Sequence, residues 1–440
     1  MLEARTRKVV MLPQCSFLSE VSRALQIAGA LRKRGVQVVF ASRGGTYAHL
    51  IGEAGYPVRR LDPAASPETE QRFLQAILSM GPFTSRDFYT NDELRTAVDA
   101  EVALLREESP DLVVTGFTLS AYVSTKVARV PLATDHAGSF VPPVLARGLC
   151  PIPVNPPDDL ARLPKPVQRF LANRVPALLK GPVKQLNRHA RERGVEPLAG
   201  LMGMMCGDLT LVTELPEILD LPSDELQAPR RFRSWGPRVT TTYRFTGPLF
   251  ARLEIPVPPE VDAFLDGSQR VVYVAPTSVD ESFLRTLVLG ARGSGVRVLV
   301  AAGPHDINDL ATDDVLVTGV LPNHLVMPRV DAAVIMGGQG SVQTAMASGT
   351  PFIGLPYHGE QELNVAVAER LGAAIRMKPA DARTPALAES LRSLLTDPDY
   401  ATAARRAAAV YAPVDGAELA AQAIIDWLDS RTHRQAAPVA

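Results

Sequence analysis

The sequence predicts an α/β protein with two halves, each built on a parallel sheet. Short apolar runs alternate with helical patterns in two stretches, one beginning at Lys8 and the other at Arg270. Such alternation is typical of parallel strands joined by helices. The chain has 440 residues, which exceeds one ordinary domain and suits two, and its apolar fraction of 46% lets each half bury a core.

The first half opens as strand, helix and strand. Lys8 to Leu12 is a short apolar run, and Ser19 to Arg34 carries apolar residues at three- and four-residue spacing before Gly35 ends the pattern. Val36 to Ala41 is the second predicted strand, and Tyr47 to Ala54 is the second helix. The half continues with a strand at Leu112 to Thr115, a helix at Leu119 to Ala128 and a strand at Leu209 to Thr213.

The linker between the halves is expected within residues 216–250. This stretch has no regular period and contains Pro216, Pro222, Pro229 and Pro237. The second half adds strands at Val271 to Ala275, Val296 to Ala301 and Val315 to Val317, and a helix at Glu281 to Ala291.

The predicted division is therefore 1–230, 231–413 and a closing segment 414–440. In the closing segment, Asp415 and Glu418 resemble a capping box for a helix at Ala417 to Leu428.

Composition excludes several classes of protein. The formal net charge is −1, which argues against a nucleic-acid binder that relies on a basic field. Cys15, Cys150 and Cys206 are far apart and odd in number, so they suggest neither a metal site nor a disulfide framework, and a reducing cytoplasm fits best. No apolar run is long enough for a signal peptide or a membrane span.

Residues 140–200 form a proline-rich insert that becomes basic toward its end. Val167, Phe170, Leu171 and Val175 recur at helical spacing among arginines and lysines. The simpler reading is a core-packed helix with a solvated basic face. The alternative is a helix pair that binds the acceptor or makes weak peripheral contact with a membrane surface.

The segment from Asp331 to Leu371 carries the clearest functional signal. An apolar strand, Ala332 to Met336, breaks into Gly337-Gly338-Gln339-Gly340, and a helical pattern restarts at Ser341. Glycines let backbone approach a ligand closely, and the first N–H groups of a helix have no partner inside it. The pattern therefore predicts an anion site suited to a diphosphate, although a glycine turn before a helix also occurs for structural reasons alone.

Polar side chains follow the next predicted strand, Phe352 to Leu355. They are Glu360, Gln361 and Asn364, and they come just after Pro356. Ligands of open α/β sheets bind at the carboxyl ends of the strands, where carboxylate and amide groups can hydrogen-bond several hydroxyls. This edge of the sheet is thus expected to hold a sugar.

The segment resembles the donor-sugar signature of family 1, UDP-glycosyltransferase-like enzymes, an inverting family that uses nucleotide sugars. The resemblance is strong over Val320 to Ala374 and implies the GT-B fold, in which two Rossmann-like domains face each other across a cleft. The matching positions are Pro322-Asn323, where the family has Pro-Gln, then Gly337, Gly338, Gly340, Ser341, Pro351, Pro356, Gln361 and Asn364, with Glu360 in place of the usual aspartate.

The resemblance also implies how the chain is divided. In the family, the N-terminal domain binds the acceptor and its variable insert, here 140–200, shapes the acceptor site. The C-terminal domain binds the nucleotide sugar, and the last helix returns to the N-terminal domain.

Two departures bear on the donor. The histidine that usually contacts the diphosphate is Met336, and the glutamate that usually binds the ribose is Thr344. The nucleotide, UDP or dTDP, therefore stays open. The donor-binding candidates are Gly337, Gly338, Gln339, Gly340, Ser341, Thr344, Met336, Glu360, Gln361, Asn364, Leu321, His324 and Thr277.

Inverting transfer also needs a general base for the acceptor hydroxyl. Glu20 aligns with the family's catalytic histidine, and a partly apolar site would make its carboxylate a better base. A helix-start carboxylate is also stabilising by itself. In the family, a partner aspartate follows the strand that corresponds to Leu112 to Thr115. The sequence there is Thr115-Gly116-Phe117, so this aspartate is missing. Asp135 and His136, at the end of another strand, are the other catalytic candidates.

The sequence thus predicts a hexosyltransferase-type enzyme that moves a sugar from a nucleotide diphosphate to a hydroxyl of a small or lipophilic acceptor, as in natural-product or lipid glycosylation. No cofactor and no metal are expected, since GT-B enzymes balance the diphosphate charge with backbone N–H groups. Two alternatives stay open. One is a non-catalytic nucleotide-binding homologue or auxiliary partner of a transferase, and the other is a nucleotide-sugar epimerase of the same fold.

Overall fold

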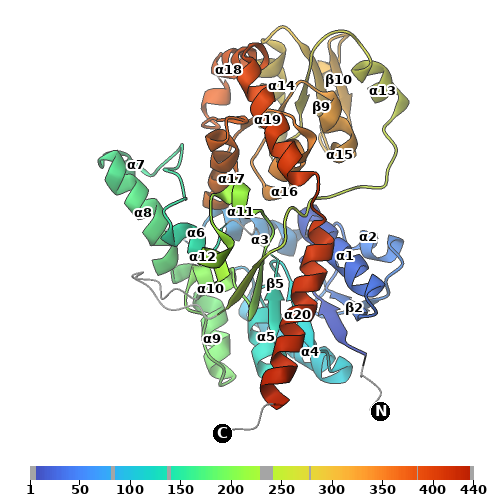
Figure 1. Ribbon diagram of the computed structural model, residues 1–440, viewed down its shortest axis with the longest axis vertical. Helices are drawn as coiled ribbons and strands as arrows, with labels where there is room; N and C mark the ends of the chain where they lie inside the picture. The colour runs from blue at the N-terminus through green and yellow to red at the C-terminus, as the bar shows by residue number, and fades with distance from the viewer. Residues whose placement is uncertain are drawn as a thin grey trace. The chain divides into compact units, whose positions relative to one another are not determined.

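The computed structural model describes residues 6–80, 85–135, 140–227, 241–276, 279–383 and 385–436, the last five of these without their side chains. The chain divides into two compact units. Unit 1 comprises Met1–Leu149, Phe170–Leu249 and Asp415–Ala440, and unit 2 comprises Cys150–Arg169 and Phe250–Val414. Figure 1 follows the chain through its helices and strands.

Unit 1 is built on a seven-stranded sheet in the order β3-β2-β1-β4-β5-β6-β7. All of these pairings are parallel, and Val10 of β1 lies opposite Val39 on one side and Val113 on the other. The chain order reverses at β1, which is where open sheets of this kind bind ligands. The strands are β1 (Lys8–Met11), β2 (Gln37–Ser42), β3 (Val58–Arg60), β4 (Leu112–Thr115), β5 (Leu132–Thr134), β6 (Leu209–Val212) and β7 (Thr242–Phe245).

Helices cross between these strands and fill the rest of the first half of the chain. They are α1 (Leu18–Lys33), α2 (His49–Glu53), α3 (Pro67–Leu78), α4 (Asn91–Glu108), α5 (Ala121–Ala128), α6 (Pro142–Ala146), α7 (Asp158–Ala161), α8 (Lys165–Leu178), α9 (Lys184–Glu192), α10 (Leu201–Met204), α11 (Pro216–Leu219) and α12 (Ser223–Gln227).

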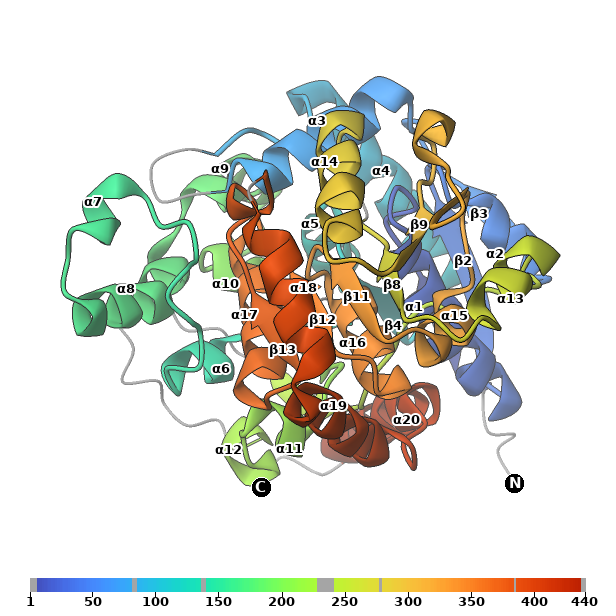
Figure 2. The same cartoon turned by 90° about the horizontal axis from the view of Figure 1, so that it is seen from above.

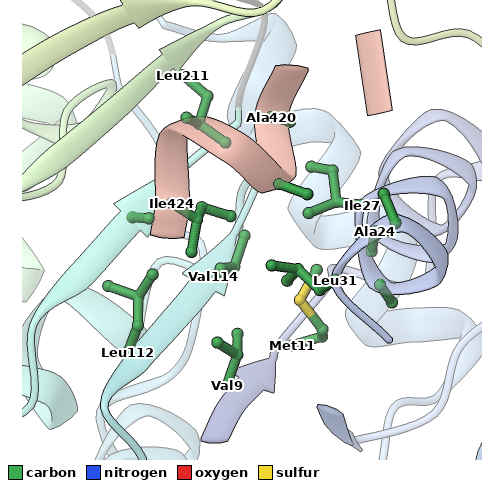
Figure 3. Packing of buried hydrophobic residues seen from close by; sticks show 14 of the residues in the cluster. Val9, Met11, Ala24, Ile27, Leu31, Leu112, Val114, Leu211, Ala420 and Ile424 are labelled. Carbon is green, nitrogen blue, oxygen red and sulfur yellow. The ribbon is translucent and has the colours of Figure 1, made fainter. Parts of the chain in front are cut away.

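One core of unit 1 joins α1 to the last helix, α20 (Gly416–Ala436). Ile27 and Leu31 of α1 and Ile424 of α20 are fully buried with Val9 and Val114 of the sheet, as Figure 3 shows. The two helices and the sheet therefore share one apolar cluster, although α20 lies at the far end of the sequence.

Unit 2 is built on a six-stranded sheet in the order β10-β9-β8-β11-β12-β13, again with all described pairings parallel. Its inner strands are continuous apolar runs, as expected of strands covered on both faces. The strands are β8 (Val271–Val274), β9 (Arg297–Ala301), β10 (Val315–Thr318), β11 (Ala332–Ile335), β12 (Phe352–Gly354) and β13 (Ala374–Arg376).

Helices α14 and α18 cover one face of this sheet, as Figure 2 shows, and bury a second core against it. Phe283 and Leu287 of α14 and Leu391 of α18 pack there with Val274 and Val334. The helices are α13 (Pro259–Leu265), α14 (Glu281–Arg292), α15 (Asn323–Val326), α16 (Gln339–Ser348), α17 (Gly359–Arg370), α18 (Ala386–Thr396) and α19 (Pro398–Tyr411).

The stretch expected to be an irregular linker contains regular structure. Residues 216–250 include α11, α12 and β7, and β7 completes the first sheet by pairing Thr242 with Leu209. Two of its prolines, Pro216 and Pro222, stand at helix starts, whereas Pro229 and Pro237 lie outside the described residues. One of the borders between the units, Leu249 to Phe250, falls at the end of the stretch where the linker was expected.

Part of the proline-rich insert belongs to unit 2. The Arg376 guanidinium donates to the carbonyl of Ile152 at 2.9 Å and pairs with Glu362 at 2.6 Å, and Glu362 accepts from the N–H of Val154 at 2.7 Å. This mostly buried ion pair holds the segment around Ile152 and Val154 against α17. Residues Cys150–Arg169 therefore group with unit 2, whereas the predicted division placed all of 1–230 in one domain.

Helix α8 of the insert exposes much of its apolar side. Val167, Phe170 and Leu178 are 41%, 54% and 46% exposed. The simpler reading of a core-packed helix is wrong for these residues, because their side chains face solvent. Among the residues that the structure describes, no helix is both long and apolar enough to cross a bilayer.

Candidate active site

The glycine turn lies between β11 and α16, as the sequence predicts. Gly337 has φ of 87°, in the left-handed region that favours glycine. A Cβ atom there would lie 2.6 Å from Cγ2 of Val365, and one on Gly354 of β12 would lie 2.4 Å from the same atom. Both glycines make room for Val365, which packs α17 against the ends of the two strands. Gly337 is thus required by the fold itself.

Gly338 and Gly340 are different from Gly337. Gly338 is the N-cap of α16 with φ of −57°, and Gly340 lies in the first helical turn. A Cβ atom at either position would meet nothing within 4 Å. Neither backbone conformation nor packing therefore calls for glycine here, although glycine in a helix costs about 0.5–1 kcal/mol relative to alanine.

Asn364 and its neighbours on α17 lie beside the turn. The Asn364 amide donates to the carbonyl oxygen of Gly337 at 3.1 Å and to Oε1 of Glu360 at 2.6 Å. Oε1 of Gln361 accepts from the N–H of Tyr357 at 2.9 Å. The structure thus brings Glu360, Gln361 and Asn364 together with the glycine turn, and the amide of Asn364 joins the two parts of the site.

Three donor-binding candidates point into the protein. Met336 and Leu321 are buried, and Met336 belongs to the apolar core of unit 2. The hydroxyl of Thr344 donates to the carbonyl of Gly340, one turn earlier in the same helix, at 2.7 Å. The side chains of Met336 and Thr344 are therefore engaged in packing and in the helix. Gln339 is also buried, whereas the side chain of Ser341 is partly exposed.

His324 lies on α15, next to Asn323, which replaces the family's usual glutamine. The hydroxyl of the buried Tyr273 donates to Oδ1 of Asn323 at 2.6 Å and fixes that side chain. Burial, with a smaller contribution from Arg252, lowers the pKa of His324, so its imidazole is neutral near pH 7. Thr277 lies outside the described residues.

In unit 1, Glu20 lies in a buried charged cluster. Its Oε1 pairs with the Arg23 guanidinium at 2.5 Å, and its Oε2 accepts from the N–H of Phe117 at 2.9 Å. Nε of Arg23 lies 3.8 Å from Oδ1 of Asp135. Glu20, Arg23 and Asp135 are 4%, 4% and 2% exposed. One buried cation therefore serves two carboxylates, Glu20 and Asp135, both of which were predicted site residues.

Two further residues define the surroundings of this cluster. Gly116, at the end of β4, has no side chain where the Glu20 carboxylate lies, since a Cβ atom there would be 1.6 Å from Glu20 Oε2. Burial, and then the nearby Cys206, Glu20 and Asp135, raise the pKa of Tyr122, whose hydroxyl donates to the carbonyl of Met204.

Sequence reasoning missed Arg23, although its spacing from Glu20 is the i,i+3 spacing of helix neighbours. His136, the third catalytic candidate, lies outside the described residues. Within the described ranges there is no group of three or more His, Cys, Asp or Glu side chains that could hold a metal ion.

Comparisons with known proteins agree with this architecture. Residues 296–426 match the family model "Erythromycin biosynthesis protein CIII-like, C-terminal domain". The chain is 26% identical over 426 residues to a PGL/p-HBAD biosynthesis glycosyltransferase of Mycobacterium tuberculosis, a match that covers 93% of this chain and 90% of the relative. It is 32% identical over 180 residues to O-mycaminosyltylonolide 6-deoxyallosyltransferase of Streptomyces fradiae, covering 40% of this chain and 42% of the relative.

The fold also has solved counterparts. The crystal structure of glycosyltransferase VinC in complex with DTDP superposes with a TM-score of 0.60, at 17% identity, and covers 96% of this chain and 100% of that one. The chain therefore has the GT-B fold and is a glycosyltransferase, and its sequence is similar to family 1 enzymes, with the family model matching its C-terminal part.

Proposed function

We propose that this glycosyltransferase moves a sugar from a dTDP or UDP donor to a hydroxyl group of a small or lipophilic acceptor, with inversion at the anomeric carbon. Unit 2 binds the donor through the turn at Gly337 to Ser341. Unit 1 binds the acceptor, and Glu20 takes its proton. The product belongs to natural-product or lipid glycosylation.

The observation that carries the donor assignment is the open space beside Gly338 and Gly340. With no protein atom within 4 Å of either Cβ position, a ligand has room to approach the backbone closely at both glycines. The N-terminus of a helix such as α16 favours an anion, and a diphosphate matches that preference. Asn364 supports the site by holding the carbonyl of Gly337.

The comparisons favour a nucleotide sugar of this kind. VinC was crystallised with DTDP, and the Mycobacterium tuberculosis relative is named for PGL/p-HBAD biosynthesis. Because Met336 is apolar and the Thr344 hydroxyl is bound to its own helix, the diphosphate is held mainly by backbone N–H groups.

In the transfer step, the acceptor oxygen forms a bond to the anomeric carbon of the sugar. The bond from that carbon to the diphosphate oxygen breaks, and the diphosphate leaves with the electron pair. The hydroxyl proton passes to Glu20, whose ionised form Arg23 and the N–H of Phe117 stabilise. Asp135, on the other side of Arg23, and His136 are the alternative proton acceptors.

The donor assignment is tested with Gly340→Val, measured by calorimetry with dTDP and with UDP. The wild-type protein should bind at least one of these nucleotides, and the variant should lose most of that affinity because the branched side chain enters the ligand space. Gly29→Val is the matched control, since Gly29 lies in helix α1 of unit 1 and also has nothing within 4 Å of its Cβ position. It should leave nucleotide affinity unchanged.

Gly337→Ala should behave differently from Gly340→Val. It should lower the stability of the folded protein as well as its nucleotide affinity. A left-handed alanine costs roughly 1–2 kcal/mol, and the overlap with Val365 adds to that cost. Equal nucleotide affinity in Gly340→Val and the wild-type protein would remove the turn from the donor site. The stereochemistry of the step is read separately, from the anomeric proton coupling in the NMR spectrum of the product.

A further inference from the structure

Helix α8 turns an apolar side toward solvent. Val167, Phe170 and Leu178 are exposed, and Leu171 is partly exposed. These residues stand at positions i, i+3, i+11 and i+4, which lie on one side of an α-helix. The apolar side of a helix is normally packed against a core, so the exposed side of α8 is available to a partner.

The buried residues of α8 are polar. They are Gln168 and Asn173, in a helix that the structure describes throughout. The Gln168 amide donates to the carbonyl oxygens of Ala161 and Leu163, at 3.2 and 2.7 Å. These hydrogen bonds tie the polar side of α8 to the segment that precedes it. The helix therefore cannot turn its apolar side inward without breaking them.

Positive charge is concentrated in the same part of the chain. Residues 160–191 include eight lysines and arginines and no aspartate or glutamate, whereas the whole chain has 46 Lys and Arg against 47 Asp and Glu. On α8, Lys165 and Arg169 are exposed, and the guanidinium of Arg174 lies 5.7 Å from the centroid of the Phe170 ring. Arg174 thus stands among the exposed apolar side chains, at i+7 from Val167.

An anionic lipid surface would satisfy both features at once. Apolar side chains of such a helix enter the acyl region, while arginine and lysine extend to the headgroup phosphates. A nucleic acid would meet the cations but leave Val167 and Leu178 in water. The helix has 14 residues, about 21 Å at 1.5 Å per residue, so it suits the plane of the surface rather than a bilayer core of about 30 Å.

We propose that α8 binds the surface of an anionic membrane, with Phe170 and Leu178 in the acyl region and Arg174 at the phosphates. The contact is peripheral, and salt weakens it because screening reduces the attraction between the cations and the lipids. The inference goes beyond sugar transfer and does not depend on the donor assignment, since α8 is separate in sequence from the glycine turn and from α17.

The first test sediments the full chain with vesicles of phosphatidylcholine, with and without phosphatidylglycerol. The protein should bind the vesicles that contain phosphatidylglycerol and be released at about 1 M salt, where the Debye length is about 3 Å. Leu178→Gln should weaken this binding about tenfold and Arg174→Gln about fivefold.

The chain offers a matched control for each variant. Leu78→Gln is the control for the leucine, because Leu78 is 58% exposed and, like Leu178, is the last residue of its helix. Arg406→Gln, at an exposed arginine of α19, is the control for Arg174→Gln. Both controls should bind the vesicles as the wild-type protein does.

A second test locates the contact on the helix. A polarity-sensitive fluorophore is attached to Phe170→Cys and, in a separate variant, to Leu78→Cys. The native cysteines Cys15, Cys150 and Cys206 are buried, so the introduced thiol should react first. Emission from position 170 should move to shorter wavelength when phosphatidylglycerol vesicles are added, and emission from position 78 should not change.

Equal sedimentation with the two kinds of vesicle, wild-type binding by Leu178→Gln, or unchanged emission from position 170 would overturn the proposal. A protein that is dimeric in gel filtration and becomes monomeric in Leu178→Gln would also overturn it, because a second copy of the chain would then cover α8.

Thermal unfolding of each variant at the wild-type temperature shows that lost binding is not lost folding. Calorimetry with dTDP and UDP separates this proposal from the donor assignment. Nucleotide binding without vesicle binding overturns only the membrane contact, whereas the reverse result overturns only the donor assignment.

Discussion

The carboxylate of Glu20 occupies the space that a side chain on Gly116 would need. A Cβ atom at position 116 would lie 1.6 Å from Oε2 and 2.4 Å from the carboxyl carbon of Glu20. The N–H of the following residue, Phe117, donates to the same oxygen at 2.9 Å. A glutamate on α1 that reaches the end of β4 therefore requires a glycine there, and the identities of the two positions are coupled.

Gly116→Ala should displace Glu20 and lower both stability and transfer. Overpacking a buried site typically costs about 1–3 kcal/mol, which urea denaturation can measure. Glu20→Asp, which shortens the side chain by one methylene, should relieve the overlap. The double variant should then be more stable than the two single effects predict. Simple additivity in this double-mutant cycle would mean that the two residues do not compete for space.

Glu20→Gln should lower the rate of transfer by about 10²–10⁴-fold without changing nucleotide affinity, because the amide keeps the shape and removes the basicity. Product formation at saturating donor is the measurement. If the variant transfers at the wild-type rate while Asp135→Asn is inactive, the proton acceptor is Asp135 and Glu20 only shapes the cluster.

Arg23→Gln separates a positioning role from a structural one. Replacing Arg23 removes the positive charge that faces the buried carboxylates of Glu20 and Asp135, so each should be harder to ionise. The acid limb of the pH profile of kcat/KM should therefore move to higher pH, and the variant should also be less stable. Arg32→Gln, an exposed arginine of the same helix, is the control. If the acid limb of the kcat/KM profile stays at the same pH in Arg23→Gln, Arg23 has a structural role only.

Much of the fold follows from hydrophobic period, because strands buried on both faces and helices with one buried face leave clear patterns. The strands at Lys8 and Leu112 and the helix of α14 lie within a residue or two of their expected ends. The strand β7 was missed because TYRF is a short edge strand among prolines, and pairing with β6, rather than its own sequence, makes it regular.

The candidate site was only partly readable from sequence. The glycine turn and the polar residues of α17 are local in sequence, so their spacing carried the signal. Apart from Arg23, the partners in this cluster are not local. Phe117 and Gly116 approach Glu20, and Asp135 approaches Arg23, only through the order of the strands. For the same reason, the sequence showed that the family's aspartate is missing near Gly116. It did not show that the Glu20 carboxylate lies where a side chain of Gly116 would be.

Stability should fall as the pH drops below about 6.5, and two histidines should contribute to this fall. Burial lowers the pKa of His189 and of His324 from the ordinary value of 6.5. The unfolded chain then binds more protons than the folded one in this window, so the free energy of unfolding decreases as the pH falls below about 6.5 and levels off below the folded pKa values. Urea denaturation of the His189→Gln/His324→Gln variant should show a shallower decrease than the wild-type protein. Parallel curves would show that neither histidine is held neutral by the fold.

Gln361→Ala and Asn364→Ala should separate sugar recognition from diphosphate recognition. The Asn364 amide holds the carbonyl of Gly337, and its loss leaves a buried acceptor without that donor, at a cost of about 1–3 kcal/mol. Because the carbonyl belongs to the turn itself, Asn364→Ala should weaken binding of free dTDP or UDP as well as of the nucleotide sugar.

Gln361 is different, since Oε1 accepts from the N–H of Tyr357 and its amide nitrogen is left to meet a sugar hydroxyl. Gln361→Ala should therefore raise the KM for the nucleotide sugar and barely change the affinity for the free nucleotide in calorimetry. If Gln361→Ala instead weakens both ligands equally, its side chain acts on the turn as Asn364 does, and the sugar contact passes to Glu360 alone.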